Sequence, residues 1–443
     1  MPTARDTIFA LSSAPGRAGI AVLRVSGPEA GGALQSLTQA DIPDARHATL
    51  RRLVESGAEI DRALVLWFPA GASFTGEDVV EFHVHGGRAV VEAVLGALGR
   101  MTGLRPAEPG EFTRRAVENG KFDLTQAEAL ADLIDAETEA QRKQALRQYE
   151  GALAALYDGW RVRLLHAAAW AEAGIDFAEE EVPEDVLARA RADSAGILAE
   201  IQEHLDDSRR GEIVRDGLYL TVIGPPNAGK SSLVNALARR DVAIVAATPG
   251  TTRDVVEVRL DLAGYPVAVA DTAGLREAAE AVEAEGVRRA LARAAAADIV
   301  VLVVDGSAAE PFAGLADATV RGASLVVWNK ADLPWPAPQT DAITGVRVSA
   351  TTGEGLNALL AALAALARAR LDRTRESPPL TRARHRHALG EAAAALDRAL
   401  QTKEPELMAE DLRLALRALG RITGRVDIEE LLDVIFRDFC VGK

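Results

Sequence analysis

The sequence of 443 residues has one cysteine, few aromatic side chains and no excess of positive charge. The single cysteine, Cys440, excludes an intrachain disulfide framework and suits a reducing compartment. The formal net charge of −15 disfavours a general nucleic-acid-binding protein, because neutralising phosphates requires clustered lysine and arginine. The first residues lack the apolar run of a signal peptide, and no uncharged apolar run of about eighteen residues follows. We therefore expect a cytoplasmic protein without a membrane anchor, in which any RNA contact is local or shared.

A glycine-rich segment at residues 224–231, GPPNAGKS, matches the phosphate-loop pattern G-x-x-x-x-G-K-S in full. It follows the apolar run 218–223 and precedes the helix-like segment SLVNAL. The glycines allow backbone N–H groups to close around phosphate oxygens, Lys230 supplies charge to the β- and γ-phosphates, and Ser231 offers a hydroxyl to Mg²⁺. A bare pattern of this kind can also be a glycine turn before an ordinary helix. The motifs that follow decide between the two interpretations.

The metal and switch motifs come after the phosphate loop. Asp271-Thr-Ala-Gly274 stands behind an apolar run, where the Asp271 carboxylate can hold Mg²⁺ through water and Gly274 can donate its N–H to the γ-phosphate. In the segment TPGTTRD we assign Thr252 as the switch threonine that completes the Mg²⁺ shell. Leu275 occupies the position of the glutamine that orients the attacking water in Ras-type enzymes. Another residue must do this, and the spacing leaves four candidates open: Glu277, Glu280, Glu283 and Glu285.

The base-recognition motif is N-K-x-D, formed by Asn329, Lys330 and Asp332 at the end of another apolar run. The Asp332 carboxylate only accepts hydrogen bonds, so it matches the N1–H and N2–H₂ donors of guanine, which adenine lacks. Five motifs in unpermuted order, each behind a strand-like run, predict a GTPase domain. The predicted nucleotide contacts are Asn227, Ala228, Gly229, Lys230, Ser231, Ser232, Thr252, Asp271, Gly274, Asn329, Lys330, Asp332, Ser349 and Ala350.

The flanking sequence indicates further domains, because 443 residues exceed a single hydrophobic core. Residues 1–120 alternate short β-branched runs with glycine turns, which predicts a small α+β domain. Residues 121–214 and 376–443 are rich in alanine, leucine, glutamate and arginine, as is typical of a helical bundle. We therefore predict a multidomain α/β + α protein with a small N-terminal α+β domain and a helical bundle domain. A Ras-like P-loop GTPase domain, residues 215–375, is inserted in the bundle.

Long motifs across nearly the whole chain resemble the MnmE (TrmE) family of tRNA modification GTPases. They include APGRAGIAVLRVSG, SFTGEDVVEFHVHGG and PGEFTRRAVENGKFDLTQAEALADLI, then TPGTTRD and DTAGLRE, and finally FCVGK. The resemblance implies GTP-dependent modification of wobble uridine at C5, of the carboxymethylaminomethyl type, performed with the FAD-containing partner MnmG. It further implies a homodimer, formed through the N-terminal domain, and a hetero-oligomeric complex through which tRNA is bound.

The resemblance also implies a folate site that takes 5-formyl-tetrahydrofolate or a related one-carbon folate. Matching motif positions assign its contacts to Arg24, Glu81, Lys121 and Lys443. Cationic groups suit the carboxylates of the ligand, and a carboxylate can pair with the N–H donors of the pterin. For Arg24 and Glu81 an ordinary strand ion pair is the alternative. Cys440 matches the near-terminal cysteine of the family. Two interpretations of Cys440 remain: a thiol role in one-carbon chemistry, or burial as an apolar side chain.

A potassium ion beside the phosphates is a further implication of the resemblance. Such a cation offsets transition-state charge as an arginine would. Asn227 matches the potassium-binding asparagine, and Ala246, Thr248 and Thr251 match the loop that completes the shell, although this loop differs locally from the family. Glu283 falls where the family places the glutamate that orients the attacking water.

The leading hypothesis is a homodimeric, potassium-stimulated GTPase whose hydrolysis gates a tRNA-modifying complex. One alternative is a ribosome-assembly GTPase switch, whose flanking regions dock on rRNA and which binds no folate. Another is a folate-binding scaffold whose GTPase is incidental. The absence of a basic RNA-binding appendage in the sequence argues against the ribosomal alternative.

Overall fold

The structure is a computed structural model, and its chain divides into two units. It describes residues 6–176, 185–240, 242–244, 258–269, 297–313, 315, 317–335, 345–371, 378–426, 432, 435–436, 439 and 442. The first unit contains Met1–Ala131, Tyr149–Leu165 and Arg413–Lys443, and the second contains Asp132–Gln148 and His166–Leu412. Among the described helices, none combines the length and the apolar character needed to cross a bilayer.

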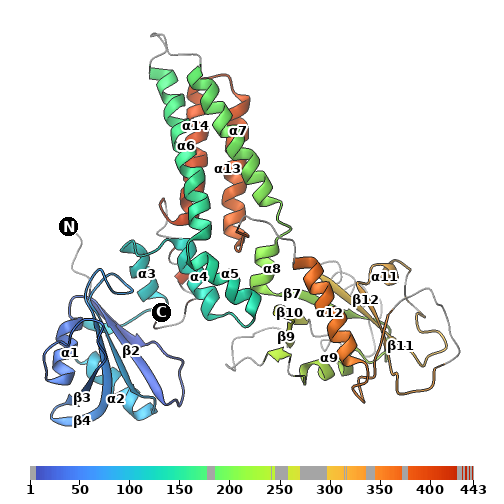
Figure 1. Ribbon diagram of the computed structural model, residues 1–443, viewed down its shortest axis with the longest axis horizontal. Coiled ribbons are helices and arrows are strands. Elements are labelled where there is room, and N and C mark those ends of the chain that lie inside the picture. Colours follow the sequence, from blue (N-terminus) through green and yellow to red (C-terminus); the bar gives the residue numbers. More distant parts are fainter. Residues whose placement is uncertain are drawn as a thin grey trace, which may run out of the picture. The chain divides into compact units, whose positions relative to one another are not determined.

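The first unit is built on a six-stranded sheet with the strand order β3-β4-β5-β2-β1-β6. Figure 1 labels β2, β3 and β4 of this sheet, together with helices α1 and α2. All neighbouring strands are antiparallel except β1 and β6, which are parallel. Helices α1 and α2 pack with the sheet into one apolar core. The elements are β1 (Thr7–Leu11), β2 (Ile20–Ser26), α1 (Ala30–Thr38), β3 (Thr49–Glu55), β4 (Ala58–Phe68), β5 (Val79–His85), α2 (Arg88–Gly99) and β6 (Leu104–Pro106).

Strand β5 shows how the sequence assigns the two faces of this sheet. Val80, Phe82 and Val84 are buried, and they share the core with α1 and α2. Glu81 and His83 alternate with them and are half-buried. Because successive side chains of a strand point to opposite faces, the polar residues lie on the face away from the helices. The predicted small α+β domain is therefore confirmed, with chemistry-bearing side chains on the face opposite its core.

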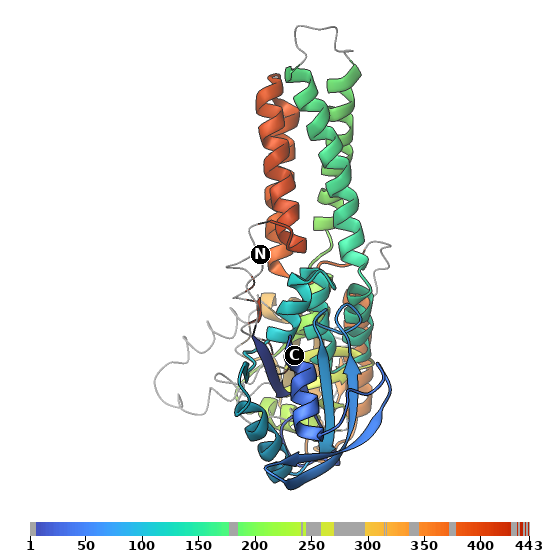
Figure 2. The same ribbon diagram turned by 90° about the vertical axis from the view of Figure 1, so that its left-hand side faces the viewer.

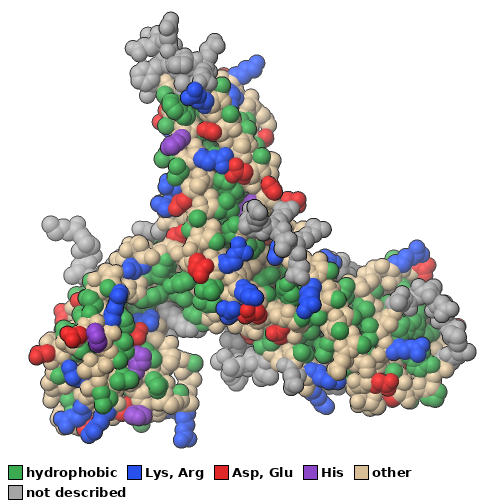
Figure 3. All heavy atoms as spheres, viewed as in Figure 1, with side chains coloured by type: hydrophobic (Ala, Val, Ile, Leu, Met, Phe, Trp, Pro, Cys, Tyr) green, Lys and Arg blue, Asp and Glu red, His purple; other side chains and the backbone are tan. Residues whose placement is uncertain are grey.

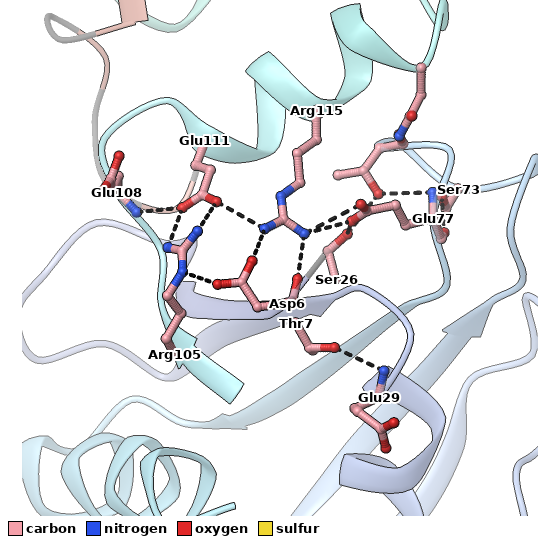
Figure 4. A network of polar contacts seen from close by, with 12 residues as sticks. Asp6, Thr7, Ser26, Glu29, Ser73, Glu77, Arg105, Glu108, Glu111 and Arg115 are labelled. Atoms are coloured by element: carbon pink, nitrogen blue, oxygen red, sulfur yellow. Dashed lines mark hydrogen bonds and ion pairs between the residues drawn. The ribbon is translucent and has the colours of Figure 1, made fainter. Parts of the chain in front are cut away.

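A buried ionic network holds helix α3 (Glu111–Glu118) against the N-terminal strands (Figure 4). The Arg115 guanidinium is 5% exposed and donates to Asp6 at 3.2 Å, Glu77 at 3.1 Å and Glu111 at 2.9 Å. Arg105 forms a second pair with Glu111 at 2.6 Å. Burial raises the pKa of Glu111, but the hydrogen bonds from Arg105, the Glu108 backbone and Arg115 outweigh burial and hold it below its usual value. Three carboxylates thus share two guanidinium groups.

The second unit contains a seven-stranded sheet with the order β13-β12-β11-β7-β10-β9-β8. Strands β7, β10, β11, β12 and β13 pair in parallel, whereas β8 and β9 join antiparallel at one edge. The strands are β7 (Leu218–Ile223), β8 (Ala243–Ile244), β9 (Val258–Leu262), β10 (Tyr265–Val269), β11 (Ile299–Asp305), β12 (Leu325–Asn329) and β13 (Val346–Arg347), with helices α9 (Lys230–Ala238), α11 (Asp317–Arg321) and α12 (Leu356–Leu371).

The central strands of this sheet are apolar on both faces. In β11, Val301 and Val303 join one core cluster, while Val300, Leu302 and Val304 join another. A strand buried on both sides is typical of a parallel sheet covered by helices. The β7–loop–α9 unit in the middle of this sheet confirms the predicted Ras-like P-loop domain.

Helices on either side of the nucleotide domain in the sequence form the helical part of the chain. Within the second unit, α7 and α13 lie side by side along their length (Figures 1 and 2), although the G domain separates them in sequence. This pairing confirms that the GTPase domain is inserted into a helical domain. The helices are α4 (Leu124–Ile134), α5 (Glu139–Tyr149), α6 (Ala152–Asp176), α7 (Asp185–Leu205), α8 (Arg210–Asp216), α13 (Ala383–Gln401) and α14 (Pro405–Thr423).

Helix α5 fixes both connections between the helical segments and the G domain. Gln141 and Gln144 donate from their side-chain amides to the carbonyls of Arg215 and Gly211, each at 2.9 Å, on the segment that enters β7. Gln148 donates to the carbonyl of Pro379, on the segment that leaves α12, at 3.4 Å. The three glutamines are spaced three and four residues apart, so they share one face of the helix.

Candidate nucleotide and N-terminal sites

The phosphate loop has backbone conformations that its sequence makes possible. Gly224 and Gly229 have φ values of +145° and +88°, a region that glycine occupies without steric cost. A Cβ on Gly224 would lie 2.0 Å from the Val303 carbonyl oxygen, and one on Gly229 would lie 2.2 Å from Nδ2 of Asn329. Helix α9 begins at Lys230, so its first backbone N–H groups face the loop and favour an anion. The loop therefore has the geometry of a phosphate site.

Lys230 is folded into this loop. Its ammonium donates to the carbonyls of Gly224 at 2.9 Å and Pro225 at 2.8 Å. Burial lowers the pKa of Lys230. Ser231 and Ser232, in the first turn of α9, are exposed. The structure thus brings together the cation and the hydroxyl that the sequence assigns to phosphates and Mg²⁺.

One buried amide joins the phosphate loop to both base-recognition loops. Asn329, the last residue of β12, is 2% exposed. Its Nδ2 donates to the Ala228 carbonyl at 2.8 Å, and its Oδ1 accepts from the Ala350 N–H at 3.1 Å. Ser349 is buried beside Ala350, and its hydroxyl accepts from the Thr352 N–H at 3.1 Å. Motifs that are far apart in the sequence therefore meet at Asn329.

The other members of the N-K-x-D motif are placed differently. Lys330 has a left-handed backbone with φ of +63°, and its ammonium binds Asp305 at 2.6 Å. Asp332 is exposed, as a residue that reads a base must be before the base binds. The Asp305 contact escaped the sequence reasoning. Asp305 ends the buried strand β11, and its partner is set by the pairing of β11 with β12, which the sequence does not state.

Asn227 is the predicted potassium ligand that the structure describes. It is exposed, with φ of +59°, a left-handed conformation that asparagine tolerates better than most residues. The other predicted switch, metal and catalytic residues lie outside the described residues, and their roles stay predictions: Ala246, Thr248, Thr251, Thr252, Asp271, Gly274, Leu275, Glu277, Glu280, Glu283 and Glu285.

Arg24 and Glu81, predicted to contact folate, form an ion pair across strands β2 and β5. They are directly opposite in register, and the guanidinium donates twice to Glu81 Oε1, at 3.0 and 2.8 Å. The Arg24 guanidinium also lies 5.3 Å from the ring centre of Phe74 and 5.7 Å from that of Phe112, within cation–π range. His83 Nε2 is 3.5 Å from Glu81. The structure shows the strand ion pair, and the folate role remains a prediction.

The C-terminal end lies beside the same strands. The Ser12 hydroxyl donates to the Gly442 carbonyl at 2.9 Å, just past the end of β1. Leu11 of β1 is opposite Leu23, the neighbour of Arg24. Lys443 and Cys440 lie outside the described residues. Lys121 is described, and its ammonium donates to the Gly71 carbonyl at 2.7 Å.

Comparisons with known proteins agree with this architecture. The family descriptions "GTP-binding protein TrmE N-terminus" and "MnmE helical domain" match residues 7–121 and 124–440. The tRNA modification GTPase MnmE of Parvibaculum lavamentivorans is 59% identical, over 99% of this chain and 100% of that protein. MnmE of Rhodospirillum rubrum is 56% identical over 99% of each chain. A mitochondrial subunit of the human 5-taurinomethyluridine-[tRNA] synthase is 52% identical, over 100% of this chain and 94% of that protein. The chain therefore belongs to the MnmE family of tRNA modification GTPases.

Proposed function

We propose that this tRNA modification GTPase is stimulated by potassium and acts with a FAD-containing partner of the MnmG type in the modification of wobble uridine at C5. The human relative is named as a subunit of a synthase of 5-taurinomethyluridine in tRNA. That name describes a uridine substituted at position 5 and an enzyme of more than one subunit, which supports modification at C5 and action together with a partner protein. The observation that carries the GTP-dependent part is the Asn329 amide, which joins three nucleotide motifs into one site.

The nucleotide is held by the phosphate loop and the N-K-x-D loop. The Lys230 ammonium leaves the carbonyls of its own loop and binds the β- and γ-phosphates, whose charge is the stronger attraction. Asp332 accepts from guanine, and Ser231, Thr252 and Asp271 would hold Mg²⁺. Bound Mg²⁺ supplies neutralising charge to the phosphates. The protein contributes the positions of these groups, because phosphoryl transfer depends chiefly on orientation and electrostatics.

Potassium and Glu283 complete the hydrolytic site. Asn227 is exposed in the phosphate loop, and its side-chain oxygen is the group proposed to bind the cation. The loop that carries Ala246, Thr248 and Thr251 provides the remaining ligands. Glu283 orients the attacking water, because Leu275 has no polar group to do so. A cation in this place offsets the charge that develops during hydrolysis.

Self-association through the N-terminal domain fits the outer face of its sheet. Strand register places Leu64 opposite both His83 and Leu50, and Ile20 opposite His85, so these residues share the face away from the core. Ile20, Leu50 and Leu64 are 62%, 65% and 45% exposed. Apolar side chains exposed together are typical of a protein interface. The homodimer forms on this face, near the Arg24 and Glu81 pair proposed to bind folate.

The tRNA is shared with the partner protein. On the face shown in Figure 3, lysine and arginine side chains are interspersed with aspartate and glutamate and do not gather into one basic surface. Strong binding of RNA phosphates needs clustered cations. A net charge of −15 therefore favours a division of labour, in which the GTPase gates the complex and the flavoprotein supplies much of the tRNA affinity.

The decisive test is GTP turnover by the full chain with sodium replaced by potassium. We expect a sharp rise with potassium, and Glu283→Ala is expected to retain nucleotide affinity while hydrolysis slows by orders of magnitude. Equal rates in the two salts, or a normally active variant, would contradict the mechanism. Mass analysis of wobble uridines from cells lacking the protein tests the modification itself.

A further inference from the structure

The loop that follows β11 lies against the N-K-x-D loop that follows β12. Because these strands pair in parallel, Asp305 stands opposite Asn329. The Gly306 N–H donates to the Asn329 carbonyl at 2.9 Å. A Cβ at Gly306 would lie 2.3 Å from Cζ2 of Trp335, so a larger residue would displace the indole. Backbone bonding and close packing therefore hold the two loops in one arrangement.

Asp305 also binds the side chain of Lys330. Its Oδ2 accepts from the ammonium at 2.6 Å, while its Oδ1 accepts from the N–H of Ser307 at 2.9 Å and from the Ser307 hydroxyl at 2.6 Å. Burial raises the pKa of Asp305, but the hydrogen bonds from Lys330 and Ser307 outweigh burial and hold it below its usual value. Both carboxylate oxygens are thus engaged, and the orientation of the carboxylate is fixed.

Lys330 is consequently constrained at both ends. Its backbone has a left-handed φ of +63°, directly after the buried Asn329, and its ammonium is held by Asp305. A lysine side chain is among the most costly to order, because it has many rotamers. The ion pair orders this side chain before a nucleotide arrives. Such preparation strengthens binding by removing part of its entropic cost.

We propose that Asp305 is a positioning residue for guanine nucleotides, which acts by holding the Lys330 side chain in place within the base-recognition loop. The inference rests on the proposed role of Asn329, Lys330 and Asp332 in guanine binding. Simple electrostatics gives the opposite expectation, since removing a carboxylate near a polyanionic ligand should tighten binding. Weaker nucleotide binding after removal of the Asp305 carboxylate therefore indicates a positioning role, whereas tighter binding indicates an effect of net charge.

The test is Asp305→Asn in the full chain. We expect the Kd for GDP from calorimetry and the KM for GTP to rise together by about tenfold, the scale on which ordering one long side chain affects binding. The kcat is expected to stay within about twofold, because the reacting phosphates are not touched. Asp305→Glu, which keeps a carboxylate, should recover part of the loss. Unchanged or tighter GDP binding, or a fall in kcat alone, would overturn the proposal.

A double-mutant cycle with Lys330→Met establishes whether Asp305 acts through Lys330. In the Lys330→Met background, Asp305→Asn should have no further effect on GDP affinity, and a full additional loss would refute the mechanism. Asp317→Asn is the matched control, since its carboxylate is 91% exposed and pairs only with Arg321 among the contacts described. Calorimetry of the wild-type protein with GDP and with ADP distinguishes a failure of the proposed function from a failure of the inference about Asp305. If the wild-type protein does not prefer GDP over ADP, the proposed function is refuted. If it prefers GDP but Asp305→Asn binds GDP as tightly as the wild type, only the inference about Asp305 is refuted.

Discussion

The Arg115→Met variant tests whether the buried ionic network secures helix α3. Methionine keeps the unbranched chain but removes the guanidinium that binds Asp6, Glu77 and Glu111. Glu111 retains Arg105 at 2.6 Å. Glu77, whose side chain is 14% exposed, retains the hydroxyl of Ser26 at 2.7 Å and loses its cation. The variant therefore leaves one carboxylate largely buried without a counterion.

Breaking a buried ion pair by removing one partner costs about 3–5 kcal/mol. Because Arg105 still pairs with Glu111 and Asp6, and the Ser26 hydroxyl still donates to Glu77, we expect the lower end, about 3 kcal/mol. Hydrogen exchange followed by mass spectrometry is the suitable assay, since it reports on α3 in a multidomain chain for which a single unfolding energy is poorly defined. Amides of residues 111–118 should exchange roughly 100-fold faster.

The controls separate loss of the charge pair from loss of packing. Arg88→Met removes a guanidinium that is 90% exposed, so it should leave exchange in its helix unchanged. Adding Glu77→Gln to Arg115→Met removes the stranded charge and should restore much of the protection in α3. Unchanged exchange in Arg115→Met, or no recovery in the double variant, would refute the reasoning.

Three further outcomes follow from single contacts. Gly229→Ala should abolish GDP binding in calorimetry, because its Cβ would lie 2.2 Å from Asn329 Nδ2 at a φ of +88°; normal affinity would contradict the loop geometry. Gln144→Ala loses its bond to the Gly211 carbonyl, so exchange in α8 should accelerate by up to roughly tenfold, for about 1 kcal/mol, while α9 stays protected. Contacts in the folded protein hold the pKa of Glu111 below its ordinary value of 4.5. The ionised carboxylate therefore contributes fully to stability above pH 4.5, and this contribution is lost as the pH falls through the lower pKa of the folded state. Protection of the α3 amides, corrected for intrinsic exchange, should decline only below pH 4.5.

The nucleotide domain was predictable because its motifs carry both local structure and chemistry. The segment 224–231 contains the glycines that the turn requires and the lysine that begins α9. Apolar runs before each motif indicate strands buried on both faces, as in a parallel sheet covered by helices. The alternation of β-branched runs with glycine turns predicted the N-terminal domain, and the alanine- and leucine-rich segments predicted the helical domain; both are confirmed.

Contacts between distant residues escaped prediction because they depend on which strands become neighbours. Asp305 and Lys330 meet because β11 and β12 pair with Asp305 opposite Asn329. Nothing within VVDG alone indicates that partner. The Arg115 network likewise joins residues 6, 77 and 111, which only the folded N-terminal sheet brings together. Local patterns fix elements, whereas register and strand order fix such pairs.

Helix α5 shows how the nucleotide domain and the helical segments of the second unit are joined. Its Ala140 N–H donates at 3.0 Å to the Gly264 carbonyl in the turn between β9 and β10, the hairpin that separates the two predicted switch segments in sequence. Glu137, just before α5, binds Arg259 of β9 at 3.1 Å, while Gln141 and Gln144 bind the entry segment. Each such bond is worth only about 1 kcal/mol. The β9–β10 hairpin is therefore joined to the α5 segment by polar contacts that are individually weak.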